Sequence, residues 1–399
     1  MLYSSLQQAK NKYSERCAVV CNGHHMSYAE LLKEVDYASE RFGELGLGGG
    51  QTAALVLSNS LEFIICLYAL SSRHVCVVLI NPQNDVEKIC ENLQMTHLDI
   101  VIMENHVYDN LKDTGASFPF QVILREHLSG YCRPGASKLM NRDDNLYQSR
   151  NEHAPVVIQC SSGTTGLPKM AIRTNRNLSV DTDNIISTFA YTEEDVVYCA
   201  VPVCHGYGLT MGLLAPLKAG AQIWLERWFM PNRLISDLSK TRLSVFLGTP
   251  EYYDILNRRQ YSERNINLSE VRLLLCSGSP LQKETGLSFH TRYGRWIQQL
   301  YGMMEVSTMS CNLAADENNV TSVGLAVNNV LIRLGAGGEI EVFSETISES
   351  YVGDRKITPA EKHGWFRTGD RGYLDETGRL YIQERIKASE QFAEMEANL

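Results

Sequence analysis

The sequence predicts an α/β fold with two α/β subdomains of mostly parallel sheet flanked by helices, plus a small antiparallel β-barrel-like subdomain. Over most of the chain, short apolar strands alternate with helical segments, the order that parallel sheets covered by helices produce. After Asn328 the pattern changes to short strands separated by turns, which favours antiparallel hairpins. The chain has 399 residues, 44% of them hydrophobic, enough for several buried cores.

The first subdomain is expected over residues 1–150. Ser27 is expected to cap a helix that begins at Tyr28, because Glu30 stands at the capping-box position. A glycine run at 46–50 ends this unit, and because it precedes a strand it cannot be a dinucleotide-binding loop. The elements expected next are a strand at 52–57, a helix begun near 58–59, and strands at 75–80 and 100–103.

The second subdomain is expected over residues 151–327, with the polar stretch 128–154 as a surface connection. Its expected strands lie at 156–160, 197–201, 221–225, 244–247 and 272–276. The small β subdomain follows over 328–385, where Gly335–Gly338 separates two alternating strands and predicts a hairpin turn. Residues 386–399 are expected to form a hinge and a tail.

Charge and composition argue against several classes of protein. The formal net charge is −9, so no overall field attracts nucleic acid or an anionic membrane. None of the 11 cysteines forms a C-x-x-C pair, and we expect reduced thiols in a cytoplasmic protein. The N-terminus lacks the apolar core of a signal peptide. Glu62, Arg73 and His74 interrupt the most apolar stretch, so no membrane span is expected.

The most informative segment runs from Gln159 to Asn177 and reads QCSSGTTGLPKMAIRTNRN. A short strand leads into a loop of two serines, two threonines, two glycines and a lysine, and a helix-compatible stretch follows. Hydroxyl and amide donors with one cation suit a polyphosphate. The spacing does not match a Walker A loop. From composition alone, an ordinary surface turn stays an open alternative.

SSGTTGLPK resembles the signature loop of the acyl-adenylate-forming superfamily, which includes acyl- and aryl-CoA synthetases, beetle luciferases and the adenylation domains of peptide synthetases. Further segments resemble that family's motifs in the same order: VPVCHGYGL at 201–209, CSGSPL at 276–281, YGMME at 301–305 and GWFRTGDRGYLDETGRLYI at 364–382. The resemblance covers nearly the whole chain and is nearest to the acyl/aryl-CoA ligase branch. It implies the fold of the large N-terminal domain of adenylate-forming enzymes.

The resemblance also implies a ligase reaction. ATP would activate a carboxylic acid to acyl-AMP with release of pyrophosphate, and the acyl group would pass to CoA or to the phosphopantetheine thiol of an acyl carrier protein. The implied catalytic residues are Lys169, His205 and Glu305, and Glu305 is also the implied Mg²⁺ ligand, since a hard carboxylate suits that ion. The implied nucleotide-binding residues are Ser161, Ser162, Gly163, Thr164, Thr165, Gly166, Lys169, Gly278, Ser279, Pro280, Tyr301, Gly302, Met303, Met304, Asp370, Ile382 and Arg385.

Each assignment has a plainer alternative. Asp370 is expected to bind both ribose hydroxyls, although a T-G-D sequence also forms ordinary turns. Tyr301 is expected to stack on adenine, although it could be a core aromatic residue. Glu305 could be a solvated glutamate, and His205, expected in a strand-to-helix turn, could be a structural hydrogen-bonding residue.

The expected substrate is a small aryl or acyl acid without an α-amino group. Residues 203–209 contain no carboxylate, and a buried substrate ammonium without a partner would be unfavourable. Aromatic acids are slightly preferred because Tyr207 offers a ring face. The residues expected to contact the acid are His205, Tyr207, Gly208, Met211, Gly248, Ser277, Gly278, Gly302, Met303 and Met309.

Several positions depart from the family pattern. These are Met170 for glycine, Asn175 for histidine, Met304 for threonine, Glu384 for glycine, and Ala388 for a hinge aspartate or lysine. Met304 and Ala388, with the missing lid described next, favour the alternative of a non-catalytic ligand- or partner-binding protein on the same fold. Lys169, Glu305, Asp370 and Arg385 oppose it. The family also continues into a smaller lid domain, which is expected to be absent here, by nature or by excision. The chain is therefore expected to bind acyl-AMP, to adenylate slowly and to form essentially no thioester by itself.

Overall fold

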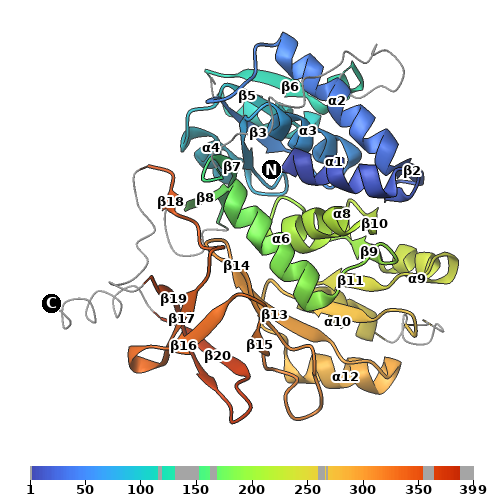
Figure 1. Ribbon diagram of the computed structural model, residues 1–399, viewed down its shortest axis with the longest axis vertical. Helices are drawn as coiled ribbons and strands as arrows, with labels where there is room; N and C mark the ends of the chain where they lie inside the picture. The colour runs from blue at the N-terminus through green and yellow to red at the C-terminus, as the bar shows by residue number, and fades with distance from the viewer. Residues whose placement is uncertain are drawn as a thin grey trace. The chain divides into compact units, whose positions relative to one another are not determined.

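The computed structural model describes residues 2–115, 119–130, 152–161, 169–258, 266, 268–353 and 364–386. The contacts within the chain divide it into two compact units. Figure 1 shows the chain coloured by residue number. Unit 1 holds residues 1–229 and 348–356, and unit 2 holds residues 230–347 and 357–399. The finer division at 150, 327 and 385 stays a prediction.

Some expected features lie outside the described residues. They are Ser162, Gly163, Thr164, Thr165 and Gly166 of the loop, most of the connection 128–154, and residues 387–399 with Ala388.

A seven-stranded sheet forms the centre of unit 1, in the order β18-β8-β7-β4-β3-β5-β6. Its parallel strands are β3 (Thr52–Val56), β4 (Cys76–Leu79), β5 (Ile100–Met103), β6 (Gln121–Leu124) and β7 (Pro155–Cys160). Two antiparallel strands, β8 (Met170–Thr174) and β18 (Ser350–Tyr351), extend one edge. The predicted parallel α/β arrangement is confirmed here, with strand ends within two residues of the predicted ones.

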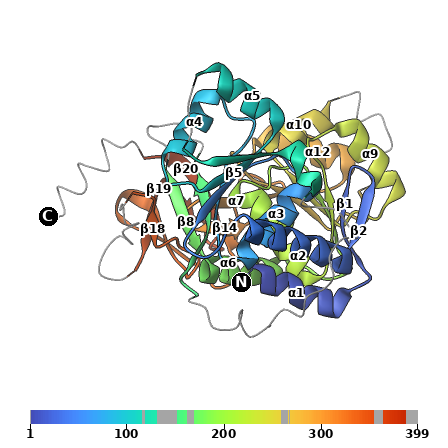
Figure 2. The same ribbon diagram turned by 90° about the horizontal axis from the view of Figure 1, so that it is seen from above.

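Helices cover both faces of this sheet (Figure 2). On one face lie α4 (Val86–Gln94) and α5 (Asn105–Asp113), whose Ile89, Leu93 and Leu111 are buried against Val78 and neighbouring strand residues. On the other face lie α2 (Tyr28–Glu44) and α3 (Leu61–Ser72), which pack together. Burial of both sheet faces accounts for the continuous apolar character of the strands.

The predicted capping of α2 is confirmed. The Ser27 hydroxyl accepts from the backbone N–H of Glu30 at 3.2 Å, and the Glu30 carboxylate accepts from the backbone N–H of Ser27 at 2.8 Å. The next helix, α3, begins at Leu61, slightly after the predicted start, because Ser60 is its N-cap.

Unit 1 also contains a second group of strands. β1 (Cys17–Cys21), β10 (Gln222–Leu225) and β9 (Val196–Cys199) are parallel, and β2 (His24–Ser27) is antiparallel to β1. The accompanying helices are α1 (Leu2–Tyr13), α6 (Asn175–Phe189), α7 (Gly206–Leu209) and α8 (Ala215–Ala219), with the π-helical turn Thr210–Leu214 between the last two. His205 directly precedes α7, as the predicted strand-to-helix turn requires.

Unit 2 begins with an α/β portion. Its strands β11 (Val245–Gly248), β12 (Leu273–Cys276) and β13 (Gln298–Met303) are parallel, and β14 (Ser307–Cys311) and β15 (Leu325–Ala326) continue antiparallel. The helices of this portion are α9 (Pro231–Lys240), α10 (Pro250–Asn257) and α12 (Lys283–Tyr293).

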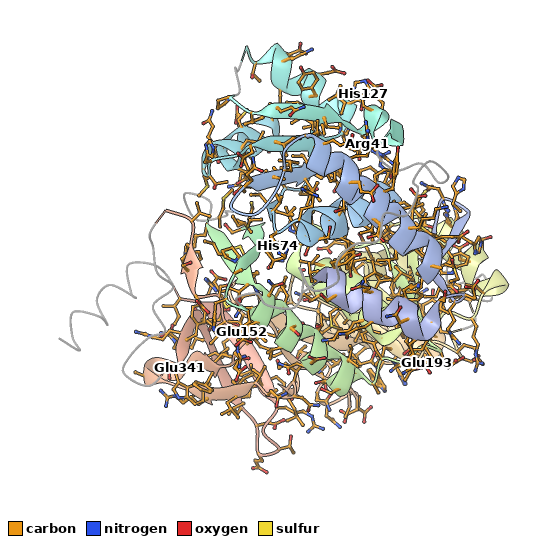
Figure 3. All side chains as sticks on the ribbon, turned by 45° about the horizontal axis from the view of Figure 1, so that its top comes forward. Arg41, His74, His127, Glu152, Glu193 and Glu341 are labelled. Carbon is orange, nitrogen blue, oxygen red and sulfur yellow. The ribbon has the colours of Figure 1, made fainter. Side chains whose placement is uncertain are left out.

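The rest of unit 2 is the predicted small antiparallel sheet. It contains β16 (Leu331–Leu334), β17 (Glu339–Phe343), β19 (Phe366–Leu374) and β20 (Leu380–Arg385) in that spatial order. Gly335–Gly338 connects β16 and β17, so the predicted hairpin turn is confirmed. Opposite charges pair across the strands, as in the bond from Arg333 to Glu341 at 2.6 Å; Figure 3 labels Glu341.

The helix-compatible stretch after the phosphate-loop segment begins as a strand and becomes a helix only at Asn175. Residues 170–174 form β8, which returns antiparallel to β7, so the loop joins two strands of a hairpin. The helix α6 begins only at Asn175, because the Thr174 hydroxyl accepts from the backbone N–H of Asn177 and caps it there. Among the described residues, no helix has the length and apolar character needed to cross a membrane.

Candidate functional site

Three predicted nucleotide-binding residues lie together in unit 2. Asp370 on β19 and Arg385 on β20 are direct cross-strand partners. Arg385 donates from Nη1 to Oδ1 of Asp370 at 2.8 Å, and the hydroxyl of Tyr301, on β13, donates to Oδ2 at 2.5 Å. The two strands of the small sheet and the end of β13 thus position one carboxylate between a hydroxyl and a guanidinium.

Burial and the neighbouring carboxylate shift the pKa values of Tyr301 and Arg385. Asp370 and Tyr301 are each only 8% exposed. Burial, reinforced by the negative charge of Asp370, raises the pKa of the Tyr301 hydroxyl well above its ordinary value, so it stays a neutral donor. Burial opposes the charge on Arg385, but the hydrogen bond and charge of Asp370 outweigh it and raise the pKa of the guanidinium.

The carboxylate of Asp370 keeps room for a ligand. Its two oxygens offer about four acceptor positions, and the two protein donors use one on each oxygen. The remaining positions can accept hydrogen bonds from a ligand. Glu305 belongs to the same electrostatic group, because its charge contributes to raising the pKa of Arg385.

Glycines bring backbones close together beside these residues. A Cβ on Gly302 would lie 2.5 Å from the carbonyl oxygen of Ser307, so only glycine fits between β13 and β14. Met303 ends β13, Met304 and Glu305 follow in the turn before β14, and Glu305 is buried.

The carboxyl ends of the parallel strands of unit 2 carry further predicted residues. Gly248 at the end of β11 pairs in register with Cys276 at the end of β12, and Ser277 donates from its backbone N–H to the carbonyl of Gly248 at 3.3 Å. Gly278 has a φ of +100°, and the nearest atom to a Cβ placed there is Cγ2 of Thr249 at 3.8 Å. This edge is where open α/β sheets bind ligands. Ser279 and Pro280, which follow Gly278, are exposed. Two other predicted residues lie elsewhere in unit 2: Ile382 is half-buried on β20, and Met309 is fully buried on β14.

In unit 1, Ser161 and Lys169 close the base of the β7–β8 loop. The Ser161 backbone N–H donates to the carbonyl of Lys169, and the Lys169 backbone N–H donates to the Ser161 hydroxyl, each at 2.9 Å. The Lys169 side chain is exposed, and its Nζ lies 5.7 Å from the ring centroid of Tyr351 on β18. The sequence did not predict this contact, since nothing near Tyr351 indicates that it lies beside Lys169, which is far away in the chain.

The predicted acid-contacting residues of unit 1 lie along the start of the helix that begins with α7. A Cβ on Gly208 would lie 2.3 Å from the carbonyl oxygen of Pro202, so the turn requires glycine. Tyr207 is half-buried and Met211 fully buried. Burial lowers the pKa of His205, whose Nε2 lies 3.2 Å from Nδ2 of Asn81. Asn81, which follows β4, was also missed by sequence reasoning.

The residues present fit Mg²⁺ only together with a phosphorylated ligand. Within the described residues, no group of three or more histidines, cysteines, aspartates or glutamates could hold a metal ion. Mg²⁺ commonly uses one or two carboxylates plus phosphate oxygens and water. A single carboxylate such as Glu305 is compatible with that mode.

Comparison with known proteins gives consistent results. A family model described as "AMP-binding enzyme" matches residues 6–342. Over 400 residues, the chain is 28% identical to 4-coumarate–CoA ligase 3 of Arabidopsis thaliana, with 93% of this chain and 71% of the relative covered. Over 418 residues, it is 26% identical to the 4-coumarate–CoA ligase of Pinus taeda, with 97% and 76% covered.

Solved structures share the fold. The inhibitor-bound N-terminal domain of FACL13 from Mycobacterium tuberculosis superposes with a TM-score of 0.86 at 20% identity, covering 96% of this chain and 99% of that domain. ATP-bound MatB from Rhodopseudomonas palustris gives a TM-score of 0.84 at 22% identity, covering 96% and 79%. The predicted architecture, two α/β subdomains with a small antiparallel sheet, is thereby confirmed.

Proposed function

Because this chain belongs to the AMP-binding enzyme family, we propose that it uses ATP to convert a carboxylic acid to its acyl-AMP, with release of pyrophosphate, and that CoA accepts the acyl group. The observation that carries the proposal is the Tyr301–Asp370–Arg385 cluster, whose buried carboxylate can offer a ribose two acceptor positions. The names of the relatives, which are CoA ligases, support CoA as the acceptor.

The nucleotide would be held by residues of unit 2. Asp370 accepts from the ribose hydroxyls, and the hydrogen bond from Arg385 orients its carboxylate. The Tyr301 ring lies against adenine while its hydroxyl stays bonded to Asp370. Gly248 and Gly278, at the carboxyl ends of the parallel strands, would let the protein backbone lie close to the adenine base and to the acyl phosphate.

The reaction needs positive charge at the departing phosphates. A free carboxylate is a poor electrophile, and attachment of AMP supplies a good leaving group. The barrier lies in the charge that builds on pyrophosphate as it leaves the α-phosphorus, so donors and cations at the phosphates lower it. We assign this role to Lys169 and the loop 161–169. Glu305 would hold Mg²⁺, which supplies charge neutralisation when bound.

The substrate would be an aryl or acyl acid without an α-amino group. Residues 203–209 contain no carboxylate to pair with an ammonium, and burial favours the neutral form of His205. The relatives are named for 4-coumarate, an aromatic acid, which supports the aryl class first. A carrier-protein thiol as acceptor stays an untested alternative.

The test is to trap the product. Protein, ATP and Mg²⁺ are incubated with hydroxylamine and a panel of aryl, fatty and α-amino acids, and acyl-hydroxamate is measured. We expect hydroxamate with at least one aryl or fatty acid and loss of it in Asp370→Ala. A protein that binds ATP and an acyl-AMP mimic by calorimetry but forms no hydroxamate with any acid would instead be a non-catalytic binding protein, the alternative that Met304 in place of threonine favours.

A further inference from the structure

Asn81 fixes the orientation of its own side chain through a local turn. Asn81 directly precedes Pro82, and its Oδ1 accepts from the backbone N–H of Gln83 at 3.0 Å. With the oxygen occupied in this way, the amide nitrogen points to His205, and Nδ2 lies 3.2 Å from Nε2 of the imidazole. The hydrogen bond to Gln83 therefore decides which end of the amide faces the histidine.

This contact determines where the imidazole carries its proton. An amide nitrogen only donates hydrogen bonds, so Nε2 of His205 must accept. A ring that accepts at Nε2 is neutral and carries its proton on Nδ1. Burial of His205, which disfavours the charged ring, acts in the same direction. Asn81 thus sets His205 as a neutral donor through Nδ1–H.

A second donor lies on the neighbouring strand. β7 pairs in parallel with β4, and Gln159 is the register partner of Leu79, two residues before Asn81. Gln159 is only 4% exposed, and its amide nitrogen has no hydrogen-bond partner among the residues that the structure describes. A Cβ on Gly206, the residue after His205, would lie 3.3 Å from that nitrogen. The Gln159 amide therefore faces the backbone next to His205.

A buried amide N–H without a partner is unfavourable, and a core position would be better filled by an apolar side chain of similar size. The Gln159 amide lies at the carboxyl end of a parallel strand and near a second neutral donor, His205, so it can donate to a bound ligand. Two neutral N–H donors suit one acceptor oxygen. Unlike a cation, they can stay bonded when a carboxylate oxygen becomes the carbonyl oxygen of an acyl phosphate.

We propose that Gln159 is a further substrate-binding residue, whose amide N–H and the Nδ1–H of His205 together donate to a carboxylate oxygen of the acid, and that Asn81 is a positioning residue for His205. This contact presupposes the proposed function, since it describes how the acid of that reaction is held.

The first experiment compares Gln159→Leu with the wild-type protein in hydroxamate formation. We expect the KM for the acid to rise about three- to tenfold, the loss of one hydrogen bond, with the KM for ATP unchanged. The melting temperature should not fall, because leucine removes an unpaired buried amide. Gln121→Leu, an exposed glutamine at the start of β6, is the matched control and should leave both KM values unchanged. An unchanged KM for the acid in Gln159→Leu would overturn the assignment of Gln159.

The second experiment needs no activity. Asn81→Asp keeps an acceptor for the Gln83 N–H but replaces the donor at His205 with an acceptor. In ¹⁵N NMR spectra recorded at a pH where the ring is neutral, wild-type His205 should carry its proton on Nδ1, and the variant should carry it on Nε2. A wild-type ring protonated at Nε2 would overturn the positioning role of Asn81. If wild type forms no hydroxamate with any acid, the proposed function fails, whereas activity with an unaffected Gln159→Leu variant contradicts this inference alone.

Discussion

Arg385 lies directly across from Asp370 in the register of β19 and β20, and its Nη1 donates to Oδ1 of Asp370 at 2.8 Å. The pairing holds the Asp370 carboxylate on β19, where the Tyr301 hydroxyl donates to its second oxygen. Because the Arg385 side chain is exposed, the ion pair itself should contribute little stability, and we propose that the carboxylate serves ligand binding.

Asp370→Ala should weaken nucleotide binding by about 1.5–3 kcal/mol, because hydrogen bonds to a charged group are lost. Titration calorimetry with ATP and with an acyl-AMP mimic measures the effect. Glu376→Ala, an exposed carboxylate in the turn between β19 and β20, is the control and should bind as wild type does. Equal affinity of Asp370→Ala and wild type would show that the ribose assignment is wrong.

Replacements of Tyr301 should separate its ring from its hydroxyl. Tyr301→Phe keeps the aromatic face and should bind AMP within about threefold of wild type, whereas Tyr301→Leu loses stacking worth about 0.5–1.5 kcal/mol. Binding of AMP is measured by calorimetry for both variants. Identical affinities for the phenylalanine and leucine variants would argue against stacking on adenine.

Glu104 should make unit 1 more stable above pH 4.5 than below it. The carboxylate precedes α5 and accepts from the Ser58 backbone N–H at 3.1 Å and from Arg125 and Arg227 at 3.3 and 3.2 Å. Burial alone would raise the pKa of Glu104, but these donors outweigh it and lower the pKa below the ordinary value of 4.5. A lowered pKa in the folded state contributes stability above pH 4.5 that is lost as the pH falls toward the folded pKa.

Glu104→Gln tests this linkage. Urea unfolding at pH 7 should show a destabilisation of about 1.5–3 kcal/mol, the usual effect of losing hydrogen bonds to a charged group. The difference from wild type should shrink as the pH falls below 4.5. Glu87→Gln, exposed on α4, should have no such effect. A difference that stays constant with pH would contradict the assigned ion pairs.

Lys169→Ala should slow acyl-AMP formation with little effect on AMP binding. Removing one electrostatic donor to a transition state reduces the rate about 10²- to 10³-fold, and AMP lacks the phosphates that Lys169 is proposed to contact. Hydroxamate formation and calorimetry with AMP provide the two measurements. Lys112→Ala, on α5, serves as the control. If Lys169→Ala forms hydroxamate at the wild-type rate, Lys169 does not stabilise the transition state as proposed.

The resemblance to the family's ordered motifs predicted Tyr301, Asp370 and Arg385, which the structure brings together. Likewise, the serine and glutamate spacing predicted the cap of α2, since a capping box is local. Elements fixed by local chemistry were therefore predictable from the sequence.

The missed features depend on tertiary pairing. Residues 170–174 are too few for periodicity to separate a strand from a helix, and pairing with β7 decides the outcome. The proposed roles of Asn81, Gln159 and Tyr351 depend on contacts with residues that are far away in the sequence. No spacing in one sequence indicates such contacts.

The most direct test of the central claim is acid-dependent exchange of labelled pyrophosphate into ATP. Exchange reports reversible acyl-AMP formation and needs no thiol acceptor. The account predicts exchange with an aryl or fatty acid, little or none with ordinary α-amino acids, and a marked loss in Asp370→Ala. Exchange with an α-amino acid alone, or no exchange with any acid by protein that binds ATP, would contradict it.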